Sequence, residues 1–484
     1  MKTGYNKRLV YFTALTAATG GLLFGFDTGV ISGAIPYFQP YFHIGDSAVE
    51  SITTAGLVGA IIGALFCGRI TDLLGRRVVI LASAVIFAVG ALWSGLAASP
   101  AQLIAARLFL GIAIGVSSFA VPLYIAEISP ARIRGRLVSL FQLMITIGIL
   151  VSYLSDLFFA DDANPACWRS MFYIGVVPAA VLFAGMWLLP ETPCWLLLKG
   201  REDESRRTLA RIEGPDAAEI SLAQTKARIA QDRTQAGWRE IFRPWLRNAL
   251  IIAVGIMFFQ QMVGINTIMY YCPRIFLMAG FADKISAIGA SVGVGIVNVV
   301  FTVVSIYFVD RLGRRRLYFL GMSGIAASLI CLAMCFAFNS YMGDAGKWLS
   351  VITVFLYIIF FAVSIGPLGW LIITEIFPLK VRGSGSSIGS LSVWIFNSIV
   401  TFTFFKIVKA LTLPGTEITV QGEQSSNPAG AFLFYALIAL AGIVWGYFYI
   451  PETKGVALEK IEKHWRDGGS PRELNEQNLK GEAP

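Results

Sequence analysis

Long apolar stretches, each bounded by glycine, proline or charged residues, recur along the whole chain. A helix needs about 20 mainly apolar residues to cross a lipid bilayer, and these stretches reach or approach that length. The pattern therefore predicts an all-α membrane protein with twelve transmembrane helices and mostly short connections. We expect the helices near residues 9–34, 50–68, 78–98, 101–126, 137–159, 172–189, 247–279, 286–309, 317–338, 350–374, 384–409 and 430–450.

Basic residues are distributed unevenly between the predicted connections. Lys and Arg concentrate in alternate loops and at both ends of the chain, as they do where such segments face the cytoplasm. The distribution predicts that both termini are cytoplasmic. Because this topology explains the formal net charge of +9, we expect a lipid bilayer around the protein and no nucleic-acid partner.

One connection, at residues 195–246, is longer and more highly charged than the others, with apolar residues at helical spacing. It predicts short amphipathic cytoplasmic helices that join two halves of six helices each. We expect an N-terminal six-helix bundle over residues 1–194, the helical linker over 195–246, a C-terminal six-helix bundle over 247–455 and a cytoplasmic tail over 456–484.

Short motifs repeat at matching positions of the two predicted halves. EISPARIRG at 127–135 matches EIFPLKVRG at 375–383, GRITDLLGRR at 68–77 matches YFVDRLGRRR at 307–316, and PETP at 190–193 matches PETK at 451–454. Repeated motifs at equivalent loops indicate a duplicated bundle. That is the architecture of a transporter whose halves rock about a central site.

The composition excludes several other classes of protein. Hydrophobic residues make up 56% of the chain and charged residues 14%, whereas a soluble chain is about 25% charged. The two histidines, His43 and His464, lie outside the apolar stretches, and the six cysteines form no CxxC pair. We therefore expect no metal site, no cofactor and no enzymatic activity.

The motifs above resemble the major facilitator superfamily and, within it, the sugar porter family. The resemblance extends from GGLLFGFDTGVISG at 20–33 through QQMVGIN in the seventh span and GPLGW in the tenth to PETKG at 451–455. FQLMITIGILVSYLSD at 141–156 is most similar to the bacterial galactose/proton type. The resemblance implies a sugar transporter of the bacterial inner membrane, and we expect it to be a monomer. In PETPCWL, Cys194 stands where the family usually has Arg, so the cytoplasmic ion pair of that Arg is not expected here.

The seventh span carries the side chains that a sugar site needs. A sugar is neutral, so amides and hydroxyls suit its hydroxyl groups and aromatic faces suit its C–H surfaces. Polar groups are costly in lipid and should face the bundle interior. The candidates are Gln260, Gln261, Asn266, Tyr270 and Tyr271. The alternatives are that the amides only join helices by hydrogen bonds and that the tyrosines form an extracellular gate.

The resemblance completes this site with residues from other spans: Phe24, Gln142, Asn298, Trp370 and Trp394. Gly366 and Pro367 are expected to break the tenth helix and expose its backbone, although a passive kink is the alternative. Ile149 occupies a position where the xylose-type symporter carries Gln, which favours a hexose, glucose or galactose, over a pentose.

Asp27 in the first span and Arg107 in the fourth form a second candidate site. Burial favours the neutral carboxyl group, whereas a nearby guanidinium favours the ionised one, so a change in their separation would bind or release a proton. In the resembling family, proton symporters carry Asp at this position and facilitators carry Asn, so Asp27 favours symport. The alternatives are a structural ion pair that never titrates and, for the whole protein, a proton-independent uniporter or a non-transporting sugar sensor.

Both halves carry charges of both signs at the predicted cytoplasmic ends of their helices. Ion pairs that form in only one conformation would bias the equilibrium between conformations, so we expect a cytoplasmic gate. Topology alone would explain the arginines but not the embedded Glu127 and Glu375. The candidates are Arg69, Asp72, Arg76, Arg77, Glu127, Arg134 and Glu191 in the first half, and Asp310, Arg311, Arg314, Arg315, Glu375, Arg382 and Glu452 in the second.

Overall fold

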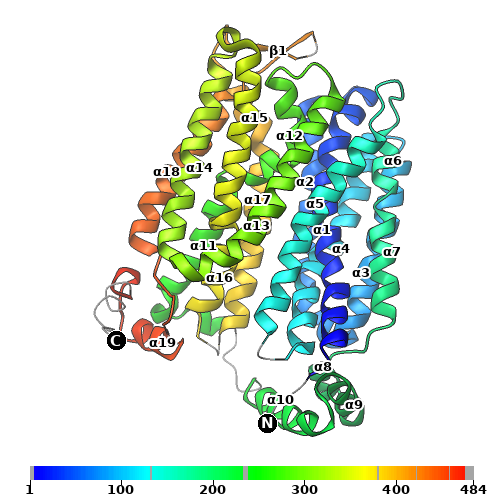
Figure 1. Ribbon diagram of the computed structural model, residues 1–484, viewed down its shortest axis with the longest axis vertical. Coiled ribbons are helices and arrows are strands. Elements are labelled where there is room, and N and C mark those ends of the chain that lie inside the picture. The colour runs from blue at the N-terminus through cyan, green and yellow to red at the C-terminus, as the bar shows by residue number, and fades with distance from the viewer. Residues whose placement is uncertain are drawn as a thin grey trace. The chain divides into compact units, whose positions relative to one another are not determined.

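The computed structural model describes residues 5–130, 133–232, 238–378, 381–420, 422–456 and 458–474. Within these residues, 12 helical segments are long and apolar enough to cross a membrane, which confirms the predicted all-α class. The chain forms two compact units, Met1–Gln235 and Ala236–Pro484, coloured blue to green and green to red in Figure 1. Each unit contains six of the membrane-spanning segments.

The first unit contains ten helices among the described residues (Figure 1). The spanning helices are α1 (Lys7–Tyr41), α2 (Asp46–Leu74), α3 (Arg76–Leu96), α4 (Pro100–Ile128), α5 (Arg134–Phe159) and the pair α6 (Trp168–Tyr173) and α7 (Val176–Trp187). Three shorter helices follow: α8 (Pro193–Leu198), α9 (Glu202–Glu213) and α10 (Pro215–Asp232). A small apolar cluster of Leu209, Ala218 and Leu222 joins α9 to α10.

The second unit begins with two short 3-10 helices, η1 (Trp238–Phe242) and η2 (Pro244–Leu246). Its longer helices are α11 (Arg247–Met262), α12 (Ile265–Met278), α13 (Lys284–Leu312), α14 (Arg314–Ala337), α15 (Asn339–Val363), α16 (Ile365–Ile376), α17 (Arg382–Leu411), α18 (Ala429–Tyr449) and α19 (Leu458–Arg466). Strands β1 (Ile418–Val420) and β2 (Glu423–Ser425) form an antiparallel hairpin between α17 and α18, with Thr419 opposite Gln424.

Helix α1 continues beyond the end that the sequence predicted for the first span. The expected stretch ended at residue 34, before Pro36, but the helix runs through Pro36 and Pro40 to Tyr41. A proline removes one backbone donor, and packed neighbouring helices compensate for this in membrane proteins. Proline is therefore a poor marker of a helix end in this setting.

A row of four glycines packs α1 closely against α5. Gly21, Gly25, Gly29 and Gly33 are spaced by four residues and therefore lie on one face of the helix. A Cβ atom on Gly25 would lie only 1.8 Å from the backbone oxygen of Ile145 on α5. Small residues at such an interface allow two backbones to approach closely. We refer to these four residues as the glycine face of α1.

Two of the membrane-spanning segments of the second unit are broken helices. Gly264 separates α11 from α12 with φ +90°, and a Cβ atom there would lie 2.8 Å from the ring of Tyr435. Ser364 separates α15 from α16 with φ −117° and ψ −99°. Pro367 lies in the first turn of α16, where a backbone N–H has no partner within the helix. The break expected from Gly366 and Pro367 is therefore present and starts at Ser364.

Candidate functional site

Asp27 and Arg107 form a buried ion pair between α1 and α4. Arg107 Nη2 donates to Asp27 Oδ2 at 2.9 Å, and Nη1 bonds the other carboxylate oxygen. The two residues are 5% and 1% exposed. A two-point contact of this kind fixes the orientation of both groups. Separating the two groups would leave an uncompensated buried charge. Each charge is therefore tolerated in this interior only while the other is beside it.

A glycine on α2 leaves room for the guanidinium of this pair. A Cβ atom on Gly56 would lie 3.2 Å from Arg107 Nη2. Arg107 therefore lies in a space bounded by α1, α2 and α4. The sequence predicted the pair, and the structure brings its two members together.

The amides of the seventh span form a connected chain in the second unit. Gln261 Nε2 donates to Gln260 Oε1 at 3.0 Å, and the Asn266 amide donates to the Gln261 oxygen. Gln260 and Gln261 lie on α11 and Asn266 lies on α12, on the two sides of the break at Gly264. The chain therefore joins the two parts of the broken helix. Amides in such a chain keep spare donors and acceptors that a hydroxylated ligand can use.

Gln260 also connects the two broken spans to each other. Its side-chain Nε2 donates to the backbone oxygens of Ile365 at 3.0 Å and of Gly366 at 2.8 Å. These oxygens lie at the start of α16, next to the break at Ser364. A Cβ atom on Gly369 would lie 2.9 Å from Gln260 Nε2, so the glycine permits this approach. The predicted residues Gln260 and Gly366 are therefore in direct contact.

The two tyrosines of α12 are buried. The Tyr271 hydroxyl donates to the backbone oxygen of Thr401 on α17 at 3.1 Å, and its ring packs against Phe405 with 4.7 Å between ring centroids. These contacts give Tyr271 a role in joining α12 to α17. Tyr270 is also buried.

The residues that the resemblance added are more dispersed. Asn298 on α13 and Trp394 on α17 are buried, whereas Trp370 on α16 is 40% exposed. In the first unit, Phe24 on α1 and Gln142 on α5 are half-buried and lie on two helices that pack together. Their partial exposure leaves side-chain surface for a ligand.

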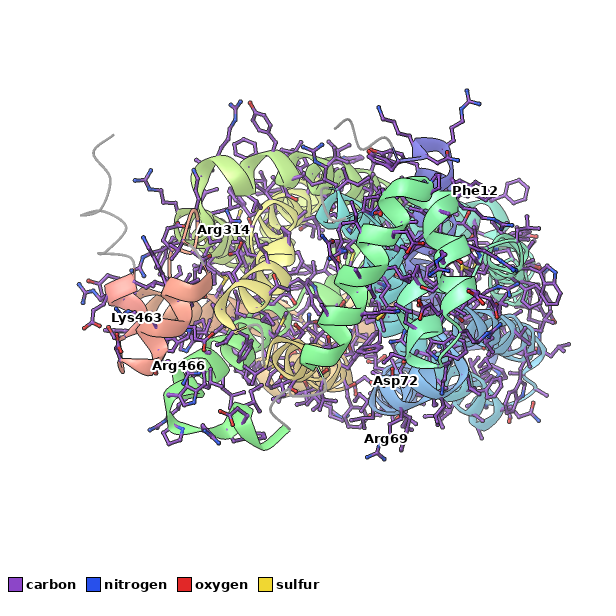
Figure 2. All side chains as sticks on the ribbon, turned by 90° about the horizontal axis from the view of Figure 1, so that it is seen from below. Phe12, Arg69, Asp72, Arg314, Lys463 and Arg466 are labelled. Atoms are coloured by element: carbon purple, nitrogen blue, oxygen red, sulfur yellow. The ribbon has the colours of Figure 1, made fainter. Side chains whose placement is uncertain are left out.

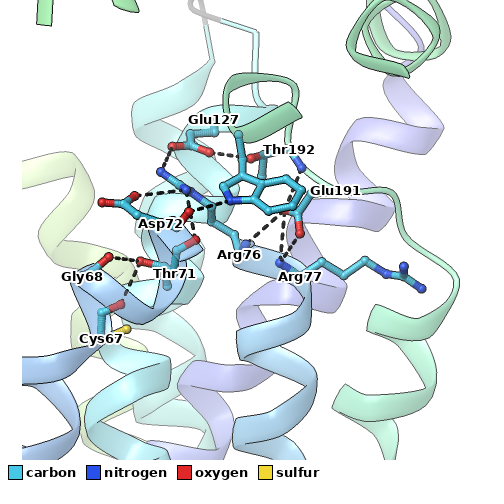
Figure 3. A network of polar contacts seen from close by, with 10 residues as sticks. Cys67, Gly68, Thr71, Asp72, Arg76, Arg77, Glu127, Glu191 and Thr192 are labelled. Carbon is cyan, nitrogen blue, oxygen red and sulfur yellow. Dashed lines mark hydrogen bonds and ion pairs between the residues drawn. The ribbon is translucent and has the colours of Figure 1, made fainter. Parts of the chain in front are cut away.

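Glu127 is the centre of a polar network in the first unit (Figure 3). Arg76 Nη2 contacts Glu127 Oε1 at 3.1 Å, and Arg76 Nη1 contacts Asp72 at 3.2 Å. The Thr192 hydroxyl donates to Glu127 Oε2 at 2.6 Å. The network therefore joins α2, α3 and α4 to the segment before α8.

Glu191 accepts backbone hydrogen bonds at the start of α3. The N–H groups of Arg76 and Arg77 donate to its carboxylate at 3.1 Å each, where a helix N-terminus favours a negative charge. Burial nevertheless raises the pKa of Glu191, and the hydrogen bonds and Arg76 only partly offset that effect. Gly75, with φ +97°, lets the loop turn beneath this carboxylate, because a Cβ atom there would lie 2.4 Å from Glu191 Oε2.

The second unit repeats this network at the equivalent residues. Arg314 Nη2 contacts Glu375 Oε1 at 2.8 Å, and the Thr453 hydroxyl donates to Glu375 Oε2 at 2.5 Å. Glu452 accepts from the N–H groups of Arg314 and Arg315 at 2.9 and 3.1 Å. The sequence repeat therefore corresponds to a repeated geometry in each unit.

Several other candidates for a gate take part in different contacts. Arg69 on α2 is exposed and its side chain points outward (Figure 2). Arg134 donates to the backbone oxygen of Ser129 at 3.5 Å. The Arg311 guanidinium lies 3.8 Å from the centre of the Tyr307 ring.

Arg77 and Arg315 use their side chains to bond the backbone of the neighbouring helices. Arg77 Nη2 donates to the oxygen of Trp187 at 2.6 Å, and Arg315 Nη1 donates to that of Ile450 at 2.7 Å. The side chains of Asp310 and Arg382, which were also predicted to belong to the gate, lie outside the described residues.

Sequence reasoning missed the hydroxyl groups of both networks. Thr192 and Thr453 follow Glu191 and Glu452 directly in the repeated PET motif, and each bonds the central glutamate of its own unit. The repeat of the motif could have identified them. Trp195, whose indole N–H donates to the backbone oxygen of Asp72 at 3.0 Å, had no comparable signal.

Comparison with known proteins is consistent with this architecture. The profile of the family described as "Sugar (and other) transporter" matches residues 13–465, which is most of the chain. The D-xylose transporter of Levilactobacillus brevis is 37% identical over 455 residues, covering 93% of this chain and 94% of that protein. The galactose-proton symporter of Escherichia coli (strain K12) is 35% identical over 471 residues, covering 97% of both chains.

A solved structure agrees with the fold. The inward-open conformation of the xylose transporter XylE from E. coli is similar, with a TM-score of 0.78 at 28% sequence identity. The alignment covers 94% of this chain and 100% of that structure.

Proposed function

Because the chain belongs to the sugar transporter family of the major facilitator superfamily, we propose that it is a proton-coupled monosaccharide symporter that works by alternating access. Its substrate is a hexose, glucose or galactose. The buried pair of Asp27 and Arg107 is the observation that carries the proposal. A relative with 35% identity is a galactose-proton symporter, which supports sugar and proton as the two substrates.

The proton acts on the pair through its charge. A proton bound by Asp27 removes the negative charge, so the attraction that holds Arg107 falls and the two helices can separate more easily. When Arg107 returns, it favours the ionised carboxylate and releases the proton. The pair therefore links protonation to the relative position of α1 and α4.

The amide chain of the second unit supplies the proposed sugar site. Gln260, Gln261 and Asn266 are neutral, connected and adjacent to both helix breaks. Sugar hydroxyls would exchange hydrogen bonds with these amides, and Trp370 offers an exposed aromatic face. The further proposed contacts are Phe24, Gln142, Tyr270, Tyr271, Asn298, Gly366 and Trp394.

The two networks around Glu127 and Glu375 are the proposed cytoplasmic gate. Each holds together the ends of several helices within its own unit. Ion pairs that persist in only one conformation would favour it by their differential free energy. In this proposal the protein is a monomer in a bacterial inner membrane, with both termini in the cytoplasm, as the distribution of Lys and Arg predicts.

The proton gradient is sufficient for uphill transport. One charge that moves down about 100 mV releases about 2.3 kcal/mol, and about 1.36 kcal/mol corresponds to a tenfold ratio. Coupling of one proton to one sugar would therefore support a concentration ratio of roughly fifty.

Sugar-dependent proton movement tests the proposed function. Addition of galactose or glucose to a weakly buffered suspension of energy-depleted cells that contain the protein should make the medium more alkaline. A parallel counterflow assay with a panel of labelled sugars should identify a hexose as the preferred substrate. Saturable sugar uptake without any pH change would contradict the proposal and indicate a uniporter.

A further inference from the structure

A second carboxyl group is buried in the first unit, on a different helix from Asp27. Asp156 lies on α5 and is 0% exposed. Among the described residues, neither of its carboxylate oxygens meets a hydrogen-bond donor in normal geometry. A buried ionised carboxylate without a cation or donors is strongly disfavoured in a low-dielectric interior. This environment therefore favours the neutral carboxyl group, which carries a proton.

The glycine face of α1 creates the space that Asp156 occupies. A Cβ atom on Gly33 would lie 2.4 Å from Asp156 Oδ2, so only glycine at position 33 leaves room for this carboxyl group. One turn earlier, Ser152 lies against Gly29 in the same way, and its hydroxyl donates to the backbone oxygen of Ile149 at 2.7 Å. Ser152 thus has a partner on its own helix, whereas the Asp156 carboxyl group has no partner among the described residues of α5 and lies against the backbone of Gly33 on α1.

Several ionisable groups on the helices that pack with α5 have partners of their own. They are Asp27 and Tyr37 on α1, Arg107 on α4, Tyr153 on α5, and Cys167 and Arg169 at the start of α6. Arg107 bonds Asp27, and the Tyr37 hydroxyl donates to Asp162 at 3.1 Å.

Arg169 is likewise engaged elsewhere. Its Nη1 donates to the backbone oxygen of Gly95 at 2.6 Å, and its guanidinium lies 4.6 Å from the centre of the Trp168 ring. Arg107 and Arg169 are therefore both committed to other groups.

The first unit thus contains two buried carboxyl groups in opposite environments, Asp27 on α1 and Asp156 on α5 beside Gly33 of α1. Asp27 has a guanidinium that stabilises its ionised form, whereas Asp156 has an environment that favours its neutral form. Pairs of acidic groups that differ in this way are typical of proton transfer sites. Asp27 and Gly33 are separated by six positions on α1, which corresponds to about 9 Å along the helix axis.

We propose that Asp156 is a second proton-binding site of this transporter, which loads and releases a proton during the transport cycle. The proposal rests on the proposed proton-coupled function. The site lies toward the C-terminal ends of α1 and α5 relative to the ion pair, so a proton that arrives from that side reaches Asp156 before Asp27. The step is a proton exchange between the Asp156 carboxyl group and water that enters when α1 and α5 move apart.

Infrared difference spectroscopy tests proton binding directly. Purified protein in liposomes is compared in acidic and alkaline buffer without sugar, and the C=O stretching bands of protonated carboxyl groups are recorded. We expect Asp156→Asn to lose one pH-dependent band that Asp27→Asn retains. Ser152→Ala, which alters the same interface without removing a titratable group, should keep the bands of the wild-type protein. If Asp156→Asn retained every wild-type band, the proposal would be overturned.

Transport assays distinguish this role from a purely structural one. Asp156→Asn should retain sugar counterflow, while the pH profile of its proton-driven uptake should shift by about one unit. An unchanged pH profile, or equal loss of counterflow and driven uptake, would contradict the proposal. If Asp156→Asn does not reach the membrane, the smaller Asp156→Ser fits the same space and is tested in its place. Because the infrared experiment needs no sugar, failure of the symport proposal would be seen separately, as absent sugar-dependent proton movement in the wild-type protein.

Discussion

The side-chain amide of Gln260 donates a hydrogen bond of 2.8 Å to the backbone oxygen of Gly366. This contact joins the seventh span, which is broken at Gly264, to the tenth span, which is broken at Ser364. The amide therefore gives two carbonyl groups in the first turn of α16 an additional donor from the seventh span. A change of ligand contacts at Gln260 would be transmitted directly to the start of α16.

Gln260→Ala should weaken sugar binding strongly. The substitution removes a donor to the proposed sugar and to the oxygens of Ile365 and Gly366, and a lost buried hydrogen bond costs about 1–3 kcal/mol. We expect the Kd for the sugar to rise by about tenfold or more, as measured by counterflow at varied sugar concentrations. Thr353→Val, at a buried hydroxyl on α15, is the matched control and should leave the Kd unchanged. An unaltered Kd in Gln260→Ala would argue against this sugar site.

Gly264→Ala should destabilise the second unit. The position has φ +90°, which costs a residue with a Cβ atom roughly 1–2 kcal/mol, and the new methyl group would meet the ring of Tyr435. Thermal unfolding of the purified protein should show a lower Tm. Gly289→Ala is the control, because a Cβ atom there meets open space and alanine is favoured in a helix. A Tm as high as that of the wild-type protein in Gly264→Ala would contradict the description of this break.

Thr453→Val should loosen the network of the second unit. The variant keeps the shape of the side chain but removes the hydroxyl that donates to Glu375 at 2.5 Å. A hydrogen bond to a charged group contributes about 1.5–3 kcal/mol, and we expect a lower Tm and a shift of the conformational equilibrium. The equivalent Thr192→Val in the first unit should have the same two effects. Double electron–electron resonance between spin labels, one in each unit, measures the shift of the conformational equilibrium. Wild-type distance distributions in both variants would contradict a gating role.

The contribution of Glu191 to the stability of the folded protein should fall as the pH rises. Burial raises the pKa of this carboxyl in the folded protein, so the folded state holds its proton more tightly than the unfolded state. The contribution of this group is fully present below its ordinary pKa and is lost as the pH rises through the raised value. Glu191→Gln should therefore flatten the dependence of Tm on pH in this window. A slope equal to that of the wild-type protein would contradict the assignment.

Asp283 should change stability with pH in the opposite direction from Glu191, and it serves as the control for that experiment. The backbone N–H of Ser286 at the start of α13 lowers the pKa of Asp283. Its contribution is present above its ordinary pKa and is lost as the pH falls through the lowered value. Asp283→Asn should thus change the Tm profile only on the acidic side.

The sequence predicted the helices and the repeat well because both depend on local signals. Apolar length predicts a spanning helix, and the repeated motifs predicted that Glu127 and Glu375 occupy equivalent places, as their contacts with Arg76 and Arg314 show. The Asp27 and Arg107 pair was predictable because charged residues are rare within apolar stretches. Asp156 could have been identified by the same rule.

Contacts between side chains were less predictable. In a membrane protein, apolar residues cover both the lipid-facing and the packed surfaces of a helix, so periodicity does not show which face meets a neighbour. The sequence therefore did not reveal that the Tyr271 hydroxyl bonds α17, or that Arg77 and Arg315 bond backbone oxygens. The exact position of the break in the tenth span, at Ser364, depends on packing that is remote in sequence.

Comparison of uphill transport with exchange in Asp27→Asn tests the central claim most directly. The assay uses purified protein in liposomes with an imposed proton gradient, and counterflow of the same labelled sugar without a gradient. We predict that Asp27→Asn loses uphill accumulation and retains counterflow, because the neutral amide occupies the same space but cannot exchange a proton. Accumulation of sugar by Asp27→Asn against its gradient, or loss of counterflow together with accumulation, would contradict proton coupling through the Asp27 and Arg107 pair.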